Sequence, residues 1–266
     1  MNYIENYYSN YDEDGRLGYK WGKVEFLTTM RYINKYMEQI PNAQVLEIGA
    51  GTGRYSRTIA DMGYQVSAVE LVQHNIEIFK SQITPTQTIN IEQGNALDLN
   101  MFTDNTFDIT LLLGPMYHLY TDADKQQAVS EALRVTKPDG VLFVAYIISD
   151  AAIIEDVFVR HRWNITEELT SGKIDSSTFG ITSMPEDIFA LIRKEDVDRI
   201  MAAFQVERLH YVATDIITRI IRESIAELDD EAFNLYLQYH FAICERPDIV
   251  GLTHHSLDIF RKQKYR

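Results

Sequence analysis

Residues 45–56 read VLEIGAGTGRYS, and this stretch decides the fold. An apolar run leads into Gly49, Gly51 and Gly53, and a helical pattern extends from there to about residue 62. Glycines at such a turn permit positive φ angles and let a ligand approach the backbone closely. The helix that follows supplies free N–H groups and the positive end of its dipole. The stretch therefore predicts a strand, a ligand-binding turn and a helix in direct succession.

The same alternation of short β-rich runs and helical stretches continues on both sides of this turn. The predicted strands are residues 44–49, 65–70, 88–93, 107–113, 140–147, 206–215 and 255–262. Predicted helices lie near residues 22–39, 53–62, 72–82, 122–136, 150–170, 193–204, 216–228 and 230–244. Strands that alternate with helices imply a parallel sheet with helices on both faces. We therefore predict an α/β fold, a Rossmann-like doubly wound domain with a seven-stranded, mostly parallel sheet.

The pattern divides the chain into four parts. They are an N-terminal arm and helix (1–41), a core (42–148), an insertion of helices and loop (149–192) and a C-terminal part of the core (193–266). The last part carries a helical insertion of its own at about 216–252. Ligands of such folds bind at the carboxyl edge of the sheet. We expect the helical segments 150–170 and 216–246 to form a lid over that edge.

Composition argues against several classes of protein. The formal net charge of -14 repels phosphate backbones, so a nucleic-acid substrate is disfavoured. The single cysteine, Cys244, cannot form an internal disulfide or build a metal site alone. The first residues lack the features of a secretory signal, and no stretch approaches the roughly 20 apolar residues of a membrane helix. We expect a cytoplasmic protein without a membrane segment.

Acidic residues at two positions narrow the ligand of the glycine-rich turn. The dinucleotide fingerprint G-x-G-x-x-G requires a third glycine where Arg54 stands. Glu47 comes two residues before Gly49, and a carboxylate there suits a cationic ligand better than a pyrophosphate. Glu70 ends the next strand and can accept both hydroxyls of a ribose. A nicotinamide dinucleotide is therefore disfavoured as the ligand. The alternative is a doubly wound domain in which the glycines only make turns and bind no ligand.

With these features, residues 42–148 resemble the class I S-adenosylmethionine-dependent methyltransferases. The resemblance implies that the turn contacts the methionine and ribose parts of the cofactor, and that GNALDL (94–99) flanks the adenine. The cofactor residues so implied are Glu47, Gly49, Ala50, Gly51, Thr52, Gly53, Glu70, Leu71, Asn95, Ala96 and Leu113. We expect S-adenosylmethionine as cofactor, S-adenosylhomocysteine as product and no metal.

The stretch LLLGPMYHLYT (111–121) ends the fourth predicted strand at the edge where the methyl group is expected. Members of the superfamily that methylate amino groups often have Asn, Asp or Ser at the position of Gly114. Methylation of an exocyclic base amine or of a glutamine amide is therefore disfavoured. His118 is a candidate general base, because its ordinary pKa lies near neutrality, or else a packing histidine against the cofactor. Tyr117 is a second candidate for catalysis, or an aromatic wall of the pocket.

Residues near the two ends of the chain give weaker indications. Tyr8, Tyr11 and Arg16 lie in the N-terminal arm and are candidates for substrate binding, since tyrosines suit the neighbourhood of a sulfonium. Ordinary packing or exposure is the alternative for them. The pair His254-His255 has no second group of ligands nearby in the sequence, so we expect no metal there.

These observations favour methyl transfer from S-adenosylmethionine to a small molecule by in-line displacement. The stretch GPMYHL, with the later VTKPDGVLF, is also similar to an uncharacterised bacterial branch of small methyltransferases. One alternative is an RNA or protein methyltransferase, which a basic surface around the pocket would favour. Another is a non-catalytic protein that binds the cofactor as a signal. A helical lid would also suit a homodimer interface.

Overall fold

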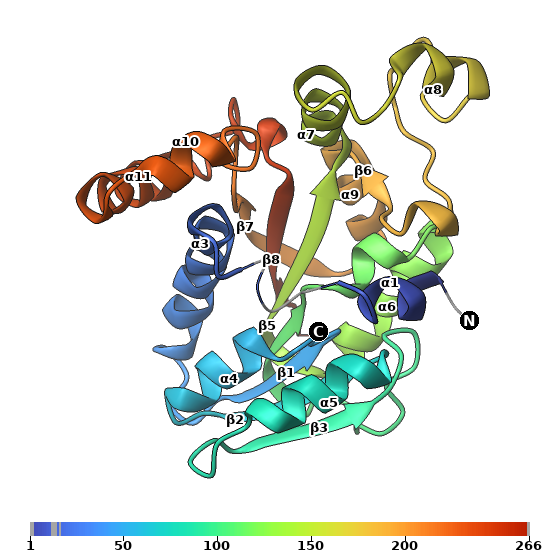
Figure 1. Cartoon of the computed structure of the whole chain (residues 1–266). Helices are drawn as coiled ribbons and strands as arrows, with labels where there is room; N and C mark the ends of the chain where they lie inside the picture. Colours follow the sequence, from blue (N-terminus) through green and yellow to red (C-terminus); the bar gives the residue numbers. More distant parts are fainter. Residues whose placement is uncertain (1–2, 12–14, 16, 265–266) are drawn as a thin grey trace.

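Figure 1 shows the computed structural model of the chain, which describes residues 3–11, 15 and 17–264. A sheet of eight strands runs through its centre. The strands are β1 (Gln44–Ile48), β2 (Gln65–Glu70), β3 (Ile89–Gln93), β4 (Phe107–Leu112), β5 (Thr136–Ile148), β6 (Leu191–Ile192), β7 (Val206–Ala213) and β8 (His255–Lys262).

Helices connect these strands. The α-helices are α1 (Tyr3–Tyr8), α3 (Lys20–Met37), α4 (Arg54–Asp61), α5 (Gln73–Gln82), α6 (Asp122–Val135), α7 (Ser149–Ile153), α8 (Ile165–Ser171), α9 (Lys194–Met201), α10 (Arg222–Glu227) and α11 (Asp230–Ile243). The 3-10 turns are η1 (Pro115–His118), η3 (Pro185–Asp187) and η4 (Val250–Leu252), and η2 (Ile154–Val159) is a π-helix. Within the described part of the chain, none of the helices has the length and apolar character needed to cross a membrane.

The strand order is β3-β2-β1-β4-β5-β8-β7, and β6 pairs with the end of β5. All neighbouring strands are parallel except β8, which is antiparallel to both β5 and β7. The predicted α/β fold with a mostly parallel sheet is confirmed. The eighth strand, β6, escaped prediction because it has only two residues, too few for a periodic pattern.

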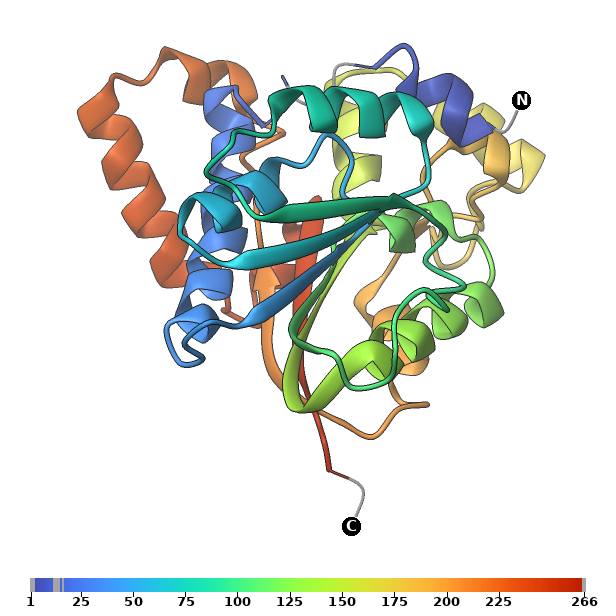
Figure 2. The ribbon, with the colours of Figure 1, turned by 90° about the horizontal axis from the view of Figure 1, so that it is seen from below.

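Apolar side chains bury both faces of the sheet. On β1, Leu46 and Ile48 belong to the cluster formed with α6 and α9, whereas Val45 belongs to the cluster formed with α3 and α4. Figure 2 shows helices on both sides of the sheet. Each fully buried aliphatic side chain contributes about 1.5–3 kcal/mol relative to an exposed one. This two-sided burial explains why the central strands are almost continuously apolar.

The two segments predicted to form a lid lie in different places. The helices α7 and α8 lie beyond the carboxyl end of β5, whereas α10 and α11 lie beside α3 (Figure 1). Val24 of α3 packs in one apolar cluster with Ile225, Phe233 and Leu237 of the second segment. Each of these helices has an apolar stripe that must be covered, and α3 and the α10–α11 pair cover one another. The predicted lid therefore divides into a part near the edge and a part that supports α3.

The boundaries of these insertions also differ from the predicted ones. The predicted helix 150–170 is broken where His161 takes a φ of 52° and Asn164 caps the start of α8. The predicted helix 216–228 begins only at Arg222, because Ile216 takes a φ of 42°. Backbone in the left-handed region cannot continue a right-handed helix. Sequence periodicity shows apolar spacing but does not show such reversals.

Candidate active site

The glycine-rich turn packs directly against the end of β4. Gly49, Gly51 and Gly53 have φ angles of 72°, 55° and 81°. A Cβ added to Gly49 would lie 2.6 Å from Cδ of Pro115, and one added to Gly114 would lie 2.9 Å from the Gly49 carbonyl oxygen. Side chains larger than hydrogen would therefore force the two loops apart. The unusual Gly114-Pro115 ending of the strand is explained by this close approach of two backbones.

A cavity of about 240 Å³ opens beside this turn at the carboxyl ends of the strands. Its lining includes every predicted cofactor residue except Gly53: Glu47, Gly49, Ala50, Gly51, Thr52, Glu70, Leu71, Asn95, Ala96 and Leu113. A Cβ on Gly53 would lie 2.2 Å from Cε2 of Phe79. Gly53 thus lets α4 begin close to α5, a packing role instead of the ligand contact predicted for it.

A second cavity of about 210 Å³ adjoins the first. Aromatic side chains form much of its wall, namely Tyr7, Tyr8, Tyr11, Tyr117, Trp163 and Phe189. The residues that line both cavities are Tyr8, Tyr117 and His255. Two of the three predicted substrate residues, Tyr8 and Tyr11, are thus placed on this wall, while Arg16 lies outside the described residues. The structure brings the N-terminal tyrosines to the predicted methyl-transfer edge.

The walls of the second cavity come from segments that are far apart in the sequence. Besides α1 they include Trp163, Lys173 and Phe189 from the insertion 149–192, Arg219 after β7, and His254 before β8. The lid predicted for 150–170 thus contributes side chains here. Sequence reasoning singled out neither Trp163 nor Phe189, because an aromatic residue in a loop gives no periodic signal.

His118 is fully engaged in hydrogen bonds. Its Nδ1 lies 2.9 Å from the carbonyl oxygen of Ile188, and its Nε2 lies 2.9 Å from the hydroxyl of Tyr8. Since a carbonyl only accepts, Nδ1 carries the proton, and Nε2 accepts from Tyr8. Burial lowers the pKa of His118 to about 4, although the bond to Ile188 opposes the shift. His118 is therefore neutral near pH 7 and joins the N-terminal helix to the insertion.

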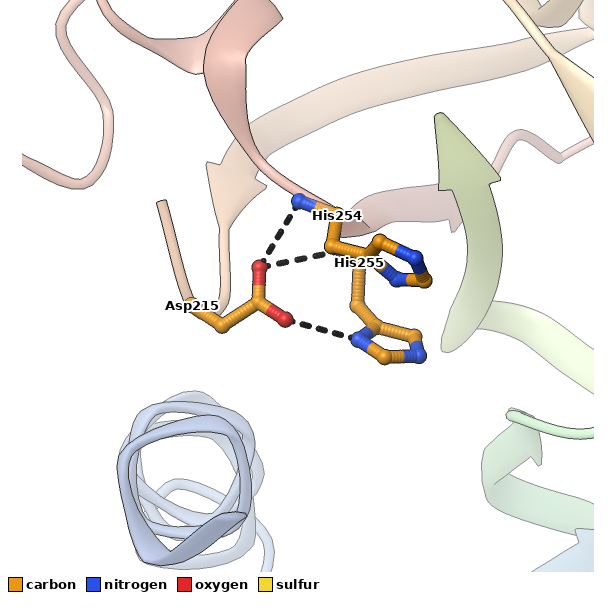
Figure 3. A group of neighbouring side chains, drawn as sticks. All are labelled: Asp215, His254 and His255. Atoms are coloured by element: carbon orange, nitrogen blue, oxygen red, sulfur yellow. Dashed lines mark hydrogen bonds and ion pairs between the residues drawn. The ribbon is translucent and has the colours of Figure 1, made fainter. Parts of the chain in front are cut away.

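A second histidine site involves Asp215, His254 and His255 (Figure 3). Nδ1 of His255 lies 2.7 Å from Oδ2 of Asp215. The other oxygen of Asp215 accepts from the backbone N–H groups of His254 and His255, at 2.9 and 3.0 Å, and from the Thr253 hydroxyl at 2.7 Å. All three residues are buried. This group could not be predicted from the sequence. Asp215 stands at the end of a predicted strand, about forty residues before its two histidine partners, and no local pattern links them.

Comparison with known proteins identifies the family. A family described as a methyltransferase domain matches residues 46–144, which hold the glycine-rich turn, Glu70 and the end of β4. Residues 46–144 therefore form a methyltransferase domain of the kind predicted from the sequence. A crystal structure of a SAM-dependent methyltransferase from Methanosarcina mazei has a similar fold, with a TM-score of 0.57 and 16% identity over 88% of this chain and 98% of that chain. The predicted superfamily is thus confirmed.

Two curated methyltransferases are similar to parts of this chain. The 2-methyl-6-phytyl-1,4-hydroquinone methyltransferase of Synechocystis sp. is 28% identical over 163 residues, which are 53% of this chain and 50% of that protein. The demethylmenaquinone methyltransferase of Renibacterium salmoninarum is 36% identical over 107 residues, 40% of this chain and 42% of that protein. The chain thus spans about half the length of these curated relatives.

The Glu70 carboxylate is placed where it could hold the ribose of the predicted cofactor. Its Oε2 accepts from the Gly51 N–H at 2.8 Å, and its Oε1 accepts from the Val72 N–H at 2.9 Å and the Asn75 amide at 3.3 Å. A carboxylate has about four acceptor positions, so one remains on Oε2 for a ribose hydroxyl. Binding of both hydroxyls, as predicted, would require one of the present contacts to be exchanged. Burial raises the pKa of Glu70, and its hydrogen bonds limit the rise.

Glu47 fits the positively charged methionine part of the cofactor. It is buried beneath the turn, where its Oε2 accepts from the N–H of Ser56 at 3.0 Å and from the Ser56 hydroxyl. Burial raises the pKa of Glu47 to about 8, against the Ser56 hydrogen bonds and with a smaller push from the charge of Glu70. A buried carboxylate of this kind favours a cation, because a nearby positive charge restores its ionised form.

Proposed function

We propose that this protein transfers the methyl group of S-adenosylmethionine to a small aromatic molecule bound in the second cavity. The observation that carries the proposal is the junction of the two cavities at Tyr8, Tyr117 and His255. One cavity is lined by the residues that fit the cofactor, and the other is walled by aromatic rings. A methyl donor on one side and an acceptor on the other would meet at these three side chains.

The chain's own contribution would be alignment and exclusion of water. The bound sulfonium supplies an already activated methyl group, so positioning of the nucleophile governs much of the rate. Tyr8 donates to His118, which lines the first cavity, and His118 donates to the carbonyl oxygen of Ile188. Ile188 holds its carbonyl there with a φ of 67°, an unfavourable conformation for a β-branched residue. Strain retained at such a point is common where geometry serves a binding site.

The second cavity suits a planar acceptor without a large negative charge. Tyrosine, tryptophan and phenylalanine rings bury apolar area and stack on aromatic ligands. Its two basic side chains are paired: Nζ of Lys173 lies 2.7 Å from Asp187, and Nε of Arg219 lies 2.8 Å from Glu155. Paired cations compete poorly for phosphate groups. One of the similar curated proteins is named for a hydroquinone, which is in keeping with an aromatic acceptor.

Binding and turnover test this proposal in two steps. Isothermal titration should detect binding of S-adenosylmethionine and of S-adenosylhomocysteine. If neither ligand binds, the proposed function is wrong. Labelled S-adenosylmethionine is then offered with phenols, catechols, hydroquinones and arylamines, and separately with total RNA and with cell protein. We expect label in an aromatic small molecule. Label in RNA or protein instead would favour the alternative enzymes, and tight binding without any transfer would favour a non-catalytic role.

A matched pair of variants links turnover to the second cavity. Phe189→Ala removes a ring from the aromatic wall, whereas Phe158→Ala removes a ring that is 60% exposed. We expect the first variant to raise the acceptor KM several-fold and to leave the affinity for S-adenosylhomocysteine unchanged. Phe158→Ala should leave both values unchanged. Equal effects of the two variants on KM would place the acceptor elsewhere.

A further inference from the structure

We propose that His255, held by Asp215, is the proton acceptor of the transfer, and that the acceptor molecule carries an aromatic hydroxyl. The inference rests on the proposed function and adds the base and the reacting group. It starts from position: His255 is the histidine that lines both cavities, whereas His118 lines the first and His254 the second. A group that removes a proton during methyl transfer must reach the point where donor and acceptor meet.

The orientation of the His255 ring is fixed by its neighbours. Burial favours the protonated acid, but the positive charge of His255 in its protonated form, the hydrogen bonds of His255 and the charge of His254 hold the pKa of Asp215 below its ordinary range. When the His255 ring is neutral, the three hydrogen bonds to Oδ1 still favour the ionised carboxylate. An ionised Asp215 can only accept, so Nδ1 of His255 carries the proton in their 2.7 Å hydrogen bond. Nε2 then presents a lone pair. Figure 3 shows this nitrogen on the side of the ring turned away from Asp215.

Asp215 itself is held rigidly. Its Oδ1 accepts from Thr253 and from two backbone N–H groups, and the N–H of Ile216 donates to the Thr253 hydroxyl at 3.0 Å. Ile216 has a φ of 42°, which a β-branched residue adopts only when its surroundings impose it. A carboxylate fixed in this way orients an imidazole and stabilises the imidazolium that forms. Asp215 is thus a positioning residue and His255 the catalytic one.

The contrast with His118 decides which histidine accepts the proton. Both nitrogens of His118 are engaged, one with Tyr8 and one with Ile188. Among the described residues, the hydrogen bond of the His255 ring uses Nδ1, so Nε2 remains available to a ligand. The titratable groups facing His255 are Asp215, His254 and Glu25 of α3, whose Oε2 lies 3.4 Å from Nδ1. Two carboxylates therefore lie beside Nδ1, on the side of the ring that faces away from the proposed acceptor.

The proposed reaction moves one proton to His255 and one methyl group to the acceptor oxygen. The O–H bond of the acceptor breaks, its proton goes to Nε2 of His255, and its electron pair stays on oxygen. That oxygen forms the new bond to the methyl carbon, and the cofactor supplies this methyl group as an electrophile and retains the electron pair of its broken carbon–sulfur bond. The proton on Nε2 then passes to solvent. An aromatic hydroxyl fits this scheme because its pKa lies within reach of an imidazole, unlike that of an aliphatic alcohol.

A metal ion is the competing use of the same three side chains, whose ligand atoms lie within 4.8 Å of one another. The hydrogen bonds argue for the proton acceptor. Oδ1 of Asp215 already accepts three hydrogen bonds and Oδ2 already accepts from Nδ1, so an ion would have to displace that network. The two uses differ in their response to a chelator and in pH dependence.

The test compares wild type with His255→Gln and Asp215→Asn, and uses His74→Gln as control because His74 is exposed on α5. The readout besides turnover is the absorbance of nitrocatechol bound in the presence of S-adenosylhomocysteine. We expect wild type to bind the phenolate at a pH where free nitrocatechol is protonated, Asp215→Asn to weaken this effect, and His255→Gln to abolish it. His74→Gln should behave as wild type.

Turnover of the best phenolic acceptor should fall about 100-fold or more in His255→Gln, as for loss of a general base. Unchanged melting temperature and S-adenosylhomocysteine affinity show that a variant is folded; if His255→Gln fails this check, Asp215→Asn carries the test. Wild-type nitrocatechol spectra in His255→Gln, or activity lost to a chelator and restored by zinc, would overturn the proposal. If wild type binds no cofactor, the proposed function itself fails, which is a separate result.

Discussion

The two cavities of this protein are built in opposite ways. Most of the first is formed by residues in or just after β1, β2, β3 and β4, so residues close in the sequence are neighbours in that part of the site. The second is assembled from α1, the insertion 149–192, Arg219 and the residues before β8. Parallel strands bring their carboxyl ends to one edge automatically, whereas insertions are placed only by packing. Sequence motifs therefore predict much of the lining of the first cavity. The lining of the second depends on insertions, whose residues can differ with the acceptor.

The largest expected effect that separates the two cavities is at Glu70. Glu70→Ala removes the carboxylate that fits the ribose and that also accepts from the N–H groups of Gly51 and Val72. Loss of hydrogen bonds to a charged group costs about 1.5–3 kcal/mol, so the Kd for S-adenosylmethionine should rise roughly 10- to 100-fold. Titration calorimetry measures it. Glu92→Ala, at an exposed position on β3, should change the Kd little; equal losses would contradict the role of Glu70.

A smaller effect is expected where the two loops of the first cavity touch. Gly114→Ala places a Cβ 2.9 Å from the Gly49 carbonyl oxygen, which belongs to backbone that cannot yield easily. We expect the free energy of unfolding to fall by about 2 kcal/mol, as for overpacking elsewhere. Urea unfolding with and without S-adenosylhomocysteine measures this. Gly251→Ala is the control, because a Cβ there meets nothing within 4 Å; a stable Gly114→Ala would mean that the loops separate freely.

The pH dependence of cofactor binding reports on Glu47. Its pKa in the folded protein is raised to about 8 from 4.5, so its ionisation costs stability as pH rises from about 4.5 to about 8. A bound cation lowers this pKa, so binding below pH 8 releases a proton. The affinity for S-adenosylmethionine should therefore rise about tenfold between roughly pH 6 and pH 8.

Glu47→Gln is the matched variant for this prediction. It should bind the cofactor more weakly at pH 8 and lose the pH dependence that comes from the protein, which separates it from any titration of the ligand. The apoprotein should also become more stable above pH 8, by on the order of 2 kcal/mol, since no buried charge is left to form. An affinity that is flat with pH in wild type would contradict the assignment.

The smallest expected effect tests the connection between the cavities. Tyr8→Phe removes the hydroxyl that donates to Nε2 of His118 at 2.9 Å. A neutral hydrogen bond contributes about 1 kcal/mol, so the acceptor KM should rise roughly 3- to 10-fold with little change in cofactor affinity. Steady-state kinetics with each ligand varied in turn measures this. Tyr3 lies on the same helix and is 54% exposed, so Tyr3→Phe should change neither the acceptor KM nor the cofactor affinity. If the affinity for the cofactor fell as much as that for the acceptor, the Tyr8 hydroxyl would serve cofactor binding in the first cavity as well.

The two histidines show where prediction from sequence ended. His118 was a sound candidate because it follows the strand end nearest the expected methyl group, but its burial and its bonds to Tyr8 and Ile188 are tertiary facts. For His255 the sequence argues only against a metal site, because no second ligand stands nearby in the sequence, yet its partner Asp215 stands 40 positions earlier. Antiparallel pairing of β7 with β8 brings the end of one strand to the start of the other.

The sequence by itself determined the sheet and its cofactor-lined cavity, because strand periodicity, turn glycines and the acids at strand ends act over a few residues. It also made Tyr8 and Tyr11 candidates for substrate binding, and both line the second cavity. Only the tertiary structure decided that α10 and α11 support α3, that Gly53 packs against Phe79, and that Asp215 orients His255. Those arrangements depend on which apolar faces cover one another and on contacts between distant segments, which no local pattern encodes.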